Sequence, residues 1–303
     1  MRHDGRRMVF YAPSFKYFES AELGKSDPYA FASISITGRR CSLGCEHCRG
    51  KLLEDMIPAT TPRDLVLAAE SLSKKGCRGL LISGGSDKDG RVPLYDFIDS
   101  IGEIKHRLGL SVVVHTGYAD DALAGALSRA DIDCAMFDVI GDDETLSSVY
   151  HLHGGISLVE STMAGLSESG IKTAPHLVCG LNYGKIRSEY DALSMIRKYS
   201  PHALVFVIIT PLSGTPMQGI PVPEPDDVAR LMKEARAMFP DIPLVLGCAR
   251  PAGKLRREYD LRALDAGFDA IAFPADETVA RVQRAGMKIE FRSECCSLIV
   301  NQD

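Results

Sequence analysis

The sequence predicts an α/β protein of the (β/α)8 TIM-type barrel class. After residue 30, short β-branched and apolar runs alternate with amphipathic stretches of helical periodicity. Several runs, such as VFVII and IPLVLG, are hydrophobic throughout, as expected of parallel strands buried on both faces. The alternative is an open doubly wound sheet. The barrel is favoured because no dinucleotide-binding glycine fingerprint follows the first expected strand.

Eight strands are expected in chain order. They are Phe31–Thr37, Gly79–Ser83, Ser111–His115, Asp133–Asp138, Ala174–Val178, Ala203–Ile209, Ile242–Gly247 and Asp269–Phe273. Eight strands that alternate with helical stretches are enough for a complete barrel. We expect residues 1–30 to form an N-terminal extension, residues 31–285 the barrel, and residues 286–303 a C-terminal tail able to fold back over one barrel end.

The helices between these strands have recognisable start and stop residues. The stretch Thr61–Lys75 opens with a threonine cap followed by a first-turn proline, and it places Leu65, Ala69 and Leu72 on one face. Further helical stretches are expected at Ala119–Arg129, Ser188–Tyr199, Asp226–Phe239 and Leu261–Gly267, the last of which ends in a glycine stop.

Composition narrows the classes of function. The 303 residues are 45% hydrophobic and 25% charged, an ordinary globular profile. A net charge of −5, with no basic stretch beyond MRHDGRR, argues against nucleic acid or an anionic membrane as partner. No apolar run approaches a bilayer span, and the start lacks the apolar core of a secretory signal. Nine scattered cysteines favour reduced thiols and a cytoplasmic location over a disulfide scaffold.

Three cysteines stand close together in the run CSLGCEHC, directly after the first expected strand. The C-x3-C-x2-C spacing of Cys41, Cys45 and Cys48 suits three corners of a four-iron, four-sulfur cluster. The fourth iron is then free to bind a small molecule and pass it an electron. A zinc site is the alternative, but zinc usually takes four ligands, and His47 is in a strained place for the fourth. Unrelated buried cysteines are a third interpretation.

This spacing resembles that of the radical S-adenosylmethionine (SAM) superfamily. The resemblance implies that Cys41, Cys45 and Cys48 are catalytic and hold a [4Fe-4S] cluster whose open iron chelates SAM. One electron, delivered by a ferredoxin or flavodoxin type of donor, would then cleave SAM to a 5′-deoxyadenosyl radical that abstracts hydrogen from carbon. The family usually has an aromatic residue before the third cysteine. His47 stands there and is able to stack near adenine.

Residues after the other strands are further candidates, because such loops gather at one mouth of a (β/α)8 barrel. Ser83, Gly84 and Gly85 follow the second strand and resemble the family's glycine pair, whose backbone contacts the amino group of SAM. Asp138 ends the fourth strand, where a carboxylate is able to accept hydrogen bonds from ribose. A loop-capping role is the alternative for Asp138.

The loop after the fifth strand resembles one of the biotin-synthase-like branch. The segment Cys179–Gly184, with Gly180 and Asn182, is similar to the glycine-containing segment that supports SAM in that branch. The resemblance also implies a cofactor-binding role for Glu189. At a helix start, however, this carboxylate would equally complement the helix dipole.

The loops after the sixth and seventh strands complete the expected mouth. The run Thr210–Pro216, which begins with Thr210 and Pro211, is similar to the loop near adenine in the same branch. Arg250 follows the seventh strand and is a candidate to hold a substrate carboxylate or carbonyl. A structural ion pair is the alternative for Arg250.

The remaining cysteines raise the question of a second cluster, which sulfur-inserting radical SAM enzymes consume as their sulfur source. We expect Cys248, Cys295 and Cys296 to hold it, with Cys179 in reserve, because the tail pair is able to reach the mouth. The alternative is that the tail thiols are unligated or serve a partner subunit. Cys134 is expected to pack as a small hydrophobe.

The functional hypothesis is sulfur insertion by one subunit of an archaeal-type two-component lipoyl synthase. The resemblance implies a second radical SAM subunit as partner and, as substrate, an octanoyl chain on a lysine of a lipoyl domain. A second hypothesis is another biotin-synthase-like reaction, such as methylation, rearrangement or cofactor maturation. A third is a cluster- or zinc-binding protein without turnover.

Overall fold

The computed structural model of the chain describes residues 7–301. Residues 1–6 and 302–303, which belong to the predicted extension and tail and include most of the basic start, lie outside the described residues. Within the described part, each of the eight expected strands is present. They are β4 (Phe31–Ser35), β6 (Gly79–Ser83), β7 (Ser111–His115), β8 (Cys134–Met136), β9 (His176–Cys179), β10 (Leu204–Ile208), β11 (Leu244–Leu246) and β12 (Ala270–Ala272).

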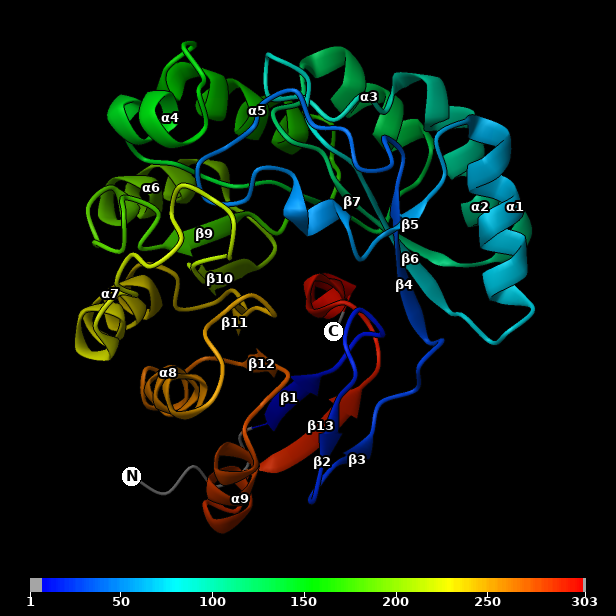
Figure 1. Ribbon diagram of the computed structural model, residues 1–303. Coiled ribbons are helices and arrows are strands. Elements are labelled where there is room, and N and C mark those ends of the chain that lie inside the picture. Colours follow the sequence, from blue (N-terminus) through cyan, green and yellow to red (C-terminus); the bar gives the residue numbers. More distant parts are fainter. Residues whose placement is uncertain (1–6, 302–303) are drawn as a thin grey trace.

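These strands are parallel and follow one another around a curved wall (Figure 1). One sheet runs β5-β4-β6-β7-β8, where β5 is Ile57–Pro58, and the other contains β12-β11-β10-β9. Two parallel bridges, Ala135 with Thr173 and Asp138 with His176, place β8 beside β9. The strand order is therefore that of a (β/α)8 barrel, and the predicted fold class is confirmed.

The wall has a seam where the expected complete ring would close. Among residues 7–301, no strand ladder joins β4 or β5 to the far edge of the other sheet. The chain after residue 11 spans this seam: the Ser14 amide donates to the Phe31 carbonyl at 3.1 Å, and the Phe31 amide donates to Ser14 Oγ at 3.1 Å. Beyond Ser14, β2 (Glu19–Ser20) and β3 (Gly24–Lys25) form a small antiparallel hairpin.

Both chain ends contribute strands that the sequence pattern did not predict. In sheet order, β13 (Lys288–Arg292) pairs with β1 (Arg7–Tyr11), and β1 pairs with β12. Both new strands are parallel to their neighbours, so they extend the wall past the eighth barrel strand. After β13, the short helix η4 (Cys296–Asn301) turns into the middle of the ring, where Figure 1 shows it in red.

Helices cover the outside of the wall (Figure 1). They are α1 (Pro62–Ser73), α2 (Ile98–Leu108), α3 (Asp121–Arg129), α4 (Asp143–Val149), α5 (Ile156–Glu168), α6 (Glu189–Ile196), α7 (Pro225–Met238), α8 (Lys254–Asp265) and α9 (Asp276–Arg284), with 3-10 turns η1 (Lys51–Leu53), η2 (Tyr95–Phe97) and η3 (Arg197–Tyr199). The predicted cap is present, because Thr61 Oγ1 accepts from the Asp64 amide at 3.1 Å. The helix expected from Leu261 begins earlier, at Lys254.

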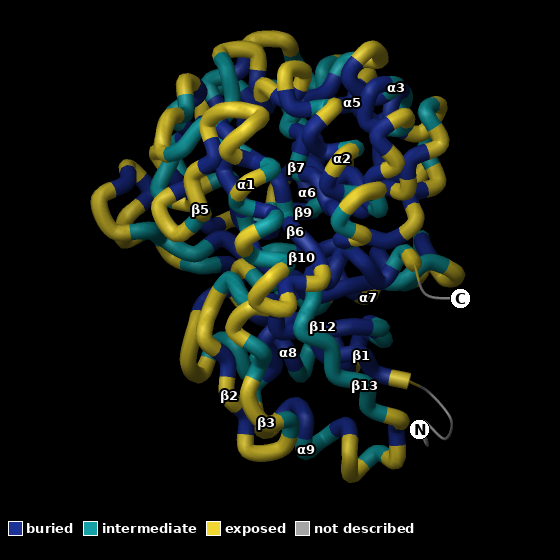
Figure 2. Tube along the Cα trace, turned by 90° about the vertical axis from the view of Figure 1, so that its right-hand side faces the viewer, coloured by how far each residue is buried: buried dark blue, intermediate teal, exposed yellow. Residues whose placement is uncertain are grey.

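Two apolar cores divide the strand residues by parity. In β7, Val112 and Val114 face the helices, whereas Val113 belongs to a second core inside the ring. The inner core, which we call the lumen core, also contains Leu298 and Ile299 of η4. Figure 2 shows the barrel strands as mostly buried tube, with the exposed segments in the loops and outer helices around them. The tail therefore packs within the barrel and not only over its end.

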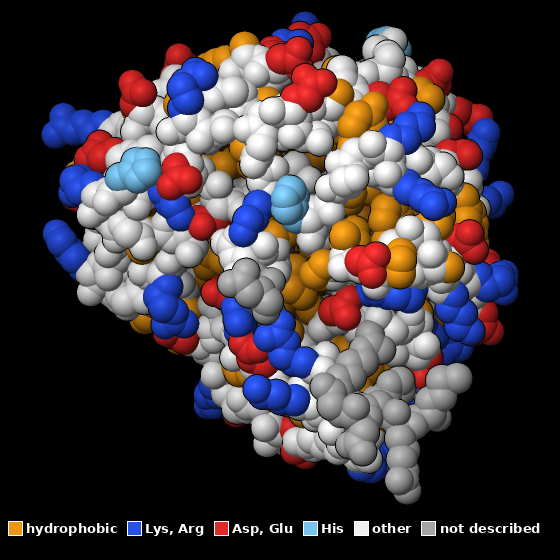
Figure 3. Space-filling model, turned by 180° about the vertical axis from the view of Figure 1, so that it is seen from behind, with side chains coloured by type: hydrophobic (Ala, Val, Ile, Leu, Met, Phe, Trp, Pro, Cys, Tyr) orange, Lys and Arg blue, Asp and Glu red, His pale blue; other side chains and the backbone are white. Residues whose placement is uncertain are grey.

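The surface carries both signs of charge. Figure 3 shows Lys and Arg side chains interspersed with Asp and Glu side chains over the face seen from behind. In the part of the chain that the structure describes, no helix has the length and apolar character needed to cross a membrane.

Candidate active site

The cysteine loop follows β4, as expected, and winds through consecutive turns. The Arg49 amide donates to the Cys45 carbonyl at 2.9 Å, and the Lys51 amide donates to the Cys48 carbonyl at 2.8 Å. Cys45 and Cys48 are buried, while Cys41 is half-buried. The turns thus bring all three thiols onto one short loop beside the barrel mouth.

Two neighbouring segments hold this loop in place. The Ser42 amide donates to the Ser86 carbonyl at 2.8 Å, and the Glu46 amide donates to the Val149 carbonyl at the end of α4, at 2.9 Å. The glycine pair packs against the same loop. A Cβ on Gly85 would lie 2.0 Å from the Arg40 carbonyl oxygen and 2.6 Å from Cys41 Cα. Glycine is required there because the two backbones touch.

The donor set fits an iron–sulfur cluster by its chemistry. A hydrogen bond from Cys45, opposed by burial and supported by His47, lowers the pKa of Cys48, and metals bind the thiolate form. His47 lies closer to the thiols than expected: its ligand nitrogen, Cys45 Sγ and Cys48 Sγ all lie within 4.8 Å of one another. Two thiols and one imidazole at this spacing are also ligand types that zinc uses.

The surroundings of His47 are compatible with the predicted stacking of its ring near adenine. Its ring packs on Tyr150 with centroids 5.2 Å apart, and its Nδ1 is buried without a hydrogen-bond partner. Tyr150 in turn donates to Asp138 Oδ2 at 2.8 Å. A buried nitrogen without a partner is able to serve a bound ligand. That His47 contacts adenine and Asp138 contacts ribose stay predictions.

The predicted adenine loop lies next to the cysteine loop. A side chain at Gly214 would meet the Lys51 side chain, just past Cys48, at 3.3 Å. Thr210 and Pro211, at the start of the loop, are partly exposed. The structure thus brings together the loops after β4, β6 and β10, as the barrel prediction requires.

Comparisons with known proteins address the family. No protein-family model matches the chain. Over 186 residues it is 24% identical to a biotin synthase from Synechococcus sp. (strain WH7803), a match that covers 60% of this chain and 55% of the relative. It is 21% identical over 250 residues to the biotin synthase of Beijerinckia indica subsp. indica, covering 78% of this chain and 75% of that one. The chain thus spans about half of the first relative's length.

Solved structures share the fold of this chain. Methylornithine synthase (PylB) superposes with a TM-score of 0.62 at 15% identity, covering 87% of this chain and 84% of that one. Streptococcus suis SuiB bound to S-adenosylmethionine gives a TM-score of 0.58 at 14% identity, covering 78% and 53%. The chain is thus similar in sequence to biotin synthases and shares the fold of methylornithine synthase and SuiB.

Within this barrel, Glu189 holds the loop after β9 in place. Its carboxylate is buried and accepts from the Gly180 and Arg187 amides, each at 2.6 Å. Both oxygens are therefore occupied by backbone, which corrects the expectation that Glu189 binds the cofactor. Gly180 has φ +81°, and a Cβ there would meet Pro223 Cγ at 2.2 Å. The glycine is required by this turn and this contact.

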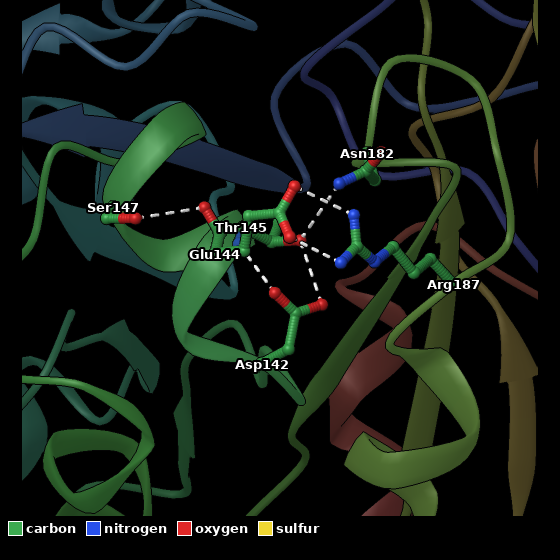
Figure 4. Close-up of polar contacts among 6 residues, drawn as sticks. All are labelled: Asp142, Glu144, Thr145, Ser147, Asn182 and Arg187. Carbon is green, nitrogen blue, oxygen red and sulfur yellow. Dashed lines mark hydrogen bonds and ion pairs between the residues drawn. The ribbon is translucent and has the colours of Figure 1, made fainter.

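Asn182 points toward the start of α4 (Figure 4). Its Nδ2 donates to Thr145 Oγ1 at 3.4 Å, while Asp142 caps the helix through the Thr145 amide at 2.6 Å. Arg187 adds an ion pair to Glu144 across the same gap. These contacts tie the loop after β9 to α4, and a direct contact between Asn182 and SAM stays a prediction.

The expectation that Arg250 acts on substrate is wrong in this structure. Its guanidinium is fully buried in an ion pair with Asp260 and donates to the Gly247 and Phe273 carbonyls at 2.7 and 3.1 Å. No face of the group reaches the mouth. The alternative, a structural ion pair, describes Arg250. The hydroxyl of Ser83, another predicted cofactor-binding residue, also has a structural partner: it donates to the His115 carbonyl at 3.2 Å.

The structure brings Cys248, Cys295 and Cys296 together in the lumen. Both tail cysteines belong to the lumen core, and Cys248 packs against it. Burial and the nearby Cys295 raise the pKa of Cys248, whereas hydrogen bonds lower that of Cys295. Cys179 is buried in the outer core instead, on the helix side of β9, so it is wrongly placed as a reserve ligand.

Three polar residues around Asp138, two on lumen-facing strand positions and one at the end of α4, escaped the sequence analysis as candidates. His115, His176 and Tyr150 surround Asp138, and the ligand atoms of His115, Asp138 and His176 lie within 4.8 Å of one another. The period-2 alternation of the strands was the available signal, because each histidine is two residues beyond a lumen core position.

Proposed function

We propose that this chain binds a [4Fe-4S] cluster on Cys41, Cys45 and Cys48 and uses it to cleave SAM. The observation that carries the proposal is the loop of three thiols, two of them buried, placed by the barrel beside the loops after β6 and β10. When bound, the cluster supplies the electron for cleavage and an iron for SAM to chelate. SuiB, a structural neighbour, has been seen with S-adenosylmethionine bound.

The protein's own residues orient and shield this site. The backbone bonds from Ser42 to Ser86 and from Glu46 to Val149 fix the loop from two sides. The imidazole of His47, held against Tyr150, offers a flat surface and a free nitrogen for the nucleoside part of SAM. The Thr210–Pro216 loop, beside Lys51, is positioned to cover that nucleoside and limit access of water.

Anaerobic reconstitution tests the cluster and the cleavage. We expect about four irons and four sulfides at this loop and 5′-deoxyadenosine from SAM when dithionite is added. Cys45→Ala should abolish cleavage, whereas Cys77→Ala, which removes a buried thiol bonded only to backbone carbonyls, should keep it. Zinc without sulfide, or no 5′-deoxyadenosine, would contradict the proposal and support a binding protein without turnover.

For the reaction, we propose sulfur insertion into an octanoyl chain, as one component of a two-component lipoyl synthase. The supporting observation is a second group of cysteines: Cys295 and Cys296 of the tail lie in the lumen core, and Cys248, in the loop after β11, packs against it. Such a reaction needs a sulfur donor close to the SAM site. The partners we propose are a second radical SAM subunit, an octanoyl-lysine of a lipoyl domain and a ferredoxin or flavodoxin type of electron donor.

The second cluster is tested by its iron. We expect about eight irons per reconstituted chain, falling by about four in Cys295→Ala and in Cys296→Ala. Cys134→Ala is a matched control, because Cys134 is a neighbouring buried thiol of the lumen core outside the proposed ligand set. An iron count of about four that the tail variants do not change would remove the second cluster.

A deuterated octanoyl-lysyl peptide tests the substrate. Deuterium should pass to 5′-deoxyadenosine, and sulfur should appear in the peptide once the partner subunit is present. If SAM is cleaved but no deuterium is transferred, the octanoyl substrate is wrong. Methylation, rearrangement or cofactor maturation then becomes the reaction to pursue.

A further inference from the structure

Three neighbouring strands each send one ligand-type side chain into the lumen. His115 ends β7, Asp138 follows β8 and His176 begins β9. Each is two residues beyond a member of the lumen core, namely Val113, Met136 and Ala174. Since alternate strand residues share a face, the three side chains point to the inside of the barrel. We call these three residues the lumen triad.

The spacing within the lumen triad suits a bound ion better than direct contact. His115 Nε2 and Asp138 Oδ1 are 3.6 Å apart, beyond a good hydrogen bond. Two ligands of one tetrahedral ion, bound at about 2.0–2.2 Å, lie about 3.3–3.6 Å apart. The ligand atoms of all three residues fall within 4.8 Å of one another. The rings of the two histidines are 5.7 Å apart and are not stacked.

A hydrogen bond from Tyr150 orients Asp138 within the lumen triad. Tyr150 donates to Asp138 Oδ2 at 2.8 Å, which leaves Oδ1 directed at His115. The Nδ1 atom of His176 is buried and has no hydrogen-bond partner.

We infer that His115, Asp138 and His176 form a divalent-cation site in the lumen, distinct from the cysteine loop. Two imidazoles and one carboxylate with open positions suit Zn²⁺ or Fe²⁺. The site does not depend on the proposed cluster or substrate, because none of its ligands is a cysteine. It does compete with the ribose contact predicted for Asp138, since both uses require Oδ1.

Zinc binding to the cluster-loaded protein tests the inference. After equilibrium dialysis against Zn²⁺ and removal of free metal, we expect one zinc per chain in addition to the cluster iron. The zinc X-ray absorption spectrum should show nitrogen and oxygen neighbours with imidazole scattering. His176→Gln and Asp138→Asn should each weaken zinc binding at least about tenfold. His153→Ala is the control, because it removes an exposed imidazole outside the triad.

Tyr150→Phe separates metal binding from folding. It keeps all three ligands and removes only the hydroxyl that orients Asp138, so zinc affinity should fall roughly 10–100-fold while the metal-free melting temperature stays close to that of wild type. Sulfur neighbours in the spectrum, or zinc binding that the triad variants leave unchanged, would overturn the site. Absence of retained zinc would do so too, and would leave Asp138 to the ribose. Cluster assembly and SAM cleavage are read separately, so either proposal can fail alone.

Discussion

At Gly85, a single missing side chain allows two functional loops to meet. The position of a Cβ would fall on the Arg40 carbonyl and on Cys41, so the loop after β6 supports the cysteine loop through its backbone. The sequence showed two glycines after a strand, but it did not show what they touch. Their role as a packing surface depends on atoms that lie more than 40 residues earlier in the chain.

Gly85→Ala should therefore damage the cysteine loop. The added methyl group overlaps backbone atoms that cannot move independently, so we expect a loss of about 1–3 kcal/mol of unfolding free energy and less retained iron. Thermal melting and iron analysis measure both effects. Gly102→Ala is the matched control, because its Cβ would have no neighbour closer than 3.9 Å. Normal iron content in Gly85→Ala would contradict the packing argument.

Glu189 gives a pH-dependent expectation. Burial raises the pKa of its carboxyl above the ordinary value, although the Gly180 and Arg187 amides act to lower it. The folded state thus binds the proton more tightly than the unfolded state does, and wild type loses stability as pH rises through the raised pKa.

Glu189→Gln removes this titration. Between pH 4 and 7, the unfolding free energy of wild type, measured against that of the variant by chemical denaturation, should fall as pH rises. A difference that is constant over this range, or that rises with pH, would show that the amide contacts outweigh burial.

At the scale of elements, the ion pair of Arg250 and Asp260 ties three pieces of the barrel together. Arg250 follows β11, Asp260 lies in α8, and the Phe273 carbonyl follows β12. Asp260 also accepts from the Ala275 amide at 2.8 Å, at the start of α9. A residue that the sequence placed at the substrate is thus a joint between elements.

Asp260→Asn should destabilise the fold strongly. It leaves the Arg250 charge buried without its counter-charge, which typically costs about 3–5 kcal/mol. Urea unfolding measures the change. Asp226→Asn breaks the exposed pair with Arg262 and should cost at most about 1 kcal/mol. Equal effects of the two variants would show that the buried pair is not a special joint.

Strand prediction succeeded where the pattern was strong and failed at the ends. The run LVFVI of β10 is apolar throughout, so its burial on both faces could be read directly. The strand β1 (RMVFY) is apolar after its first residue, but it is isolated from the alternation that marks the barrel. The strand β13 (KIEFR) carries charges along a half-buried edge. β1 forms by pairing with β12, and β13 forms by pairing with β1, so the two strands extend the wall one after the other.

At the scale of the whole molecule, the tail is part of the barrel interior. Leu298 and Ile299 are buried in the lumen core beside strand residues from both sheets. The segment from Cys295 to Ile299 thus packs in the space that the barrel strands enclose. The same segment places Cys295 and Cys296 in the lumen core.

Leu298→Ala tests how much of the global stability depends on the tail. Removing a side chain with 4% exposure should cost about 2–5 kcal/mol in unfolding free energy. Leu67→Ala, the same change at 50% exposure on α1, should stay within about 0.5 kcal/mol. A tail that only touches the surface would give equal, small effects in both variants.

The amino-acid sequence alone was sufficient to predict the barrel strands and the place of the cysteine loop, because each depends on a local pattern: buried apolar runs, or the spacing of three thiols. Folding in three dimensions decided the rest. Arg250 and Glu189 look functional along the chain, yet buried partners occupy them. The lumen triad looks ordinary along the chain, yet parallel strands align its members side by side. Whether a charged group faces substrate or structure depends on its partners, and those partners are distant in sequence.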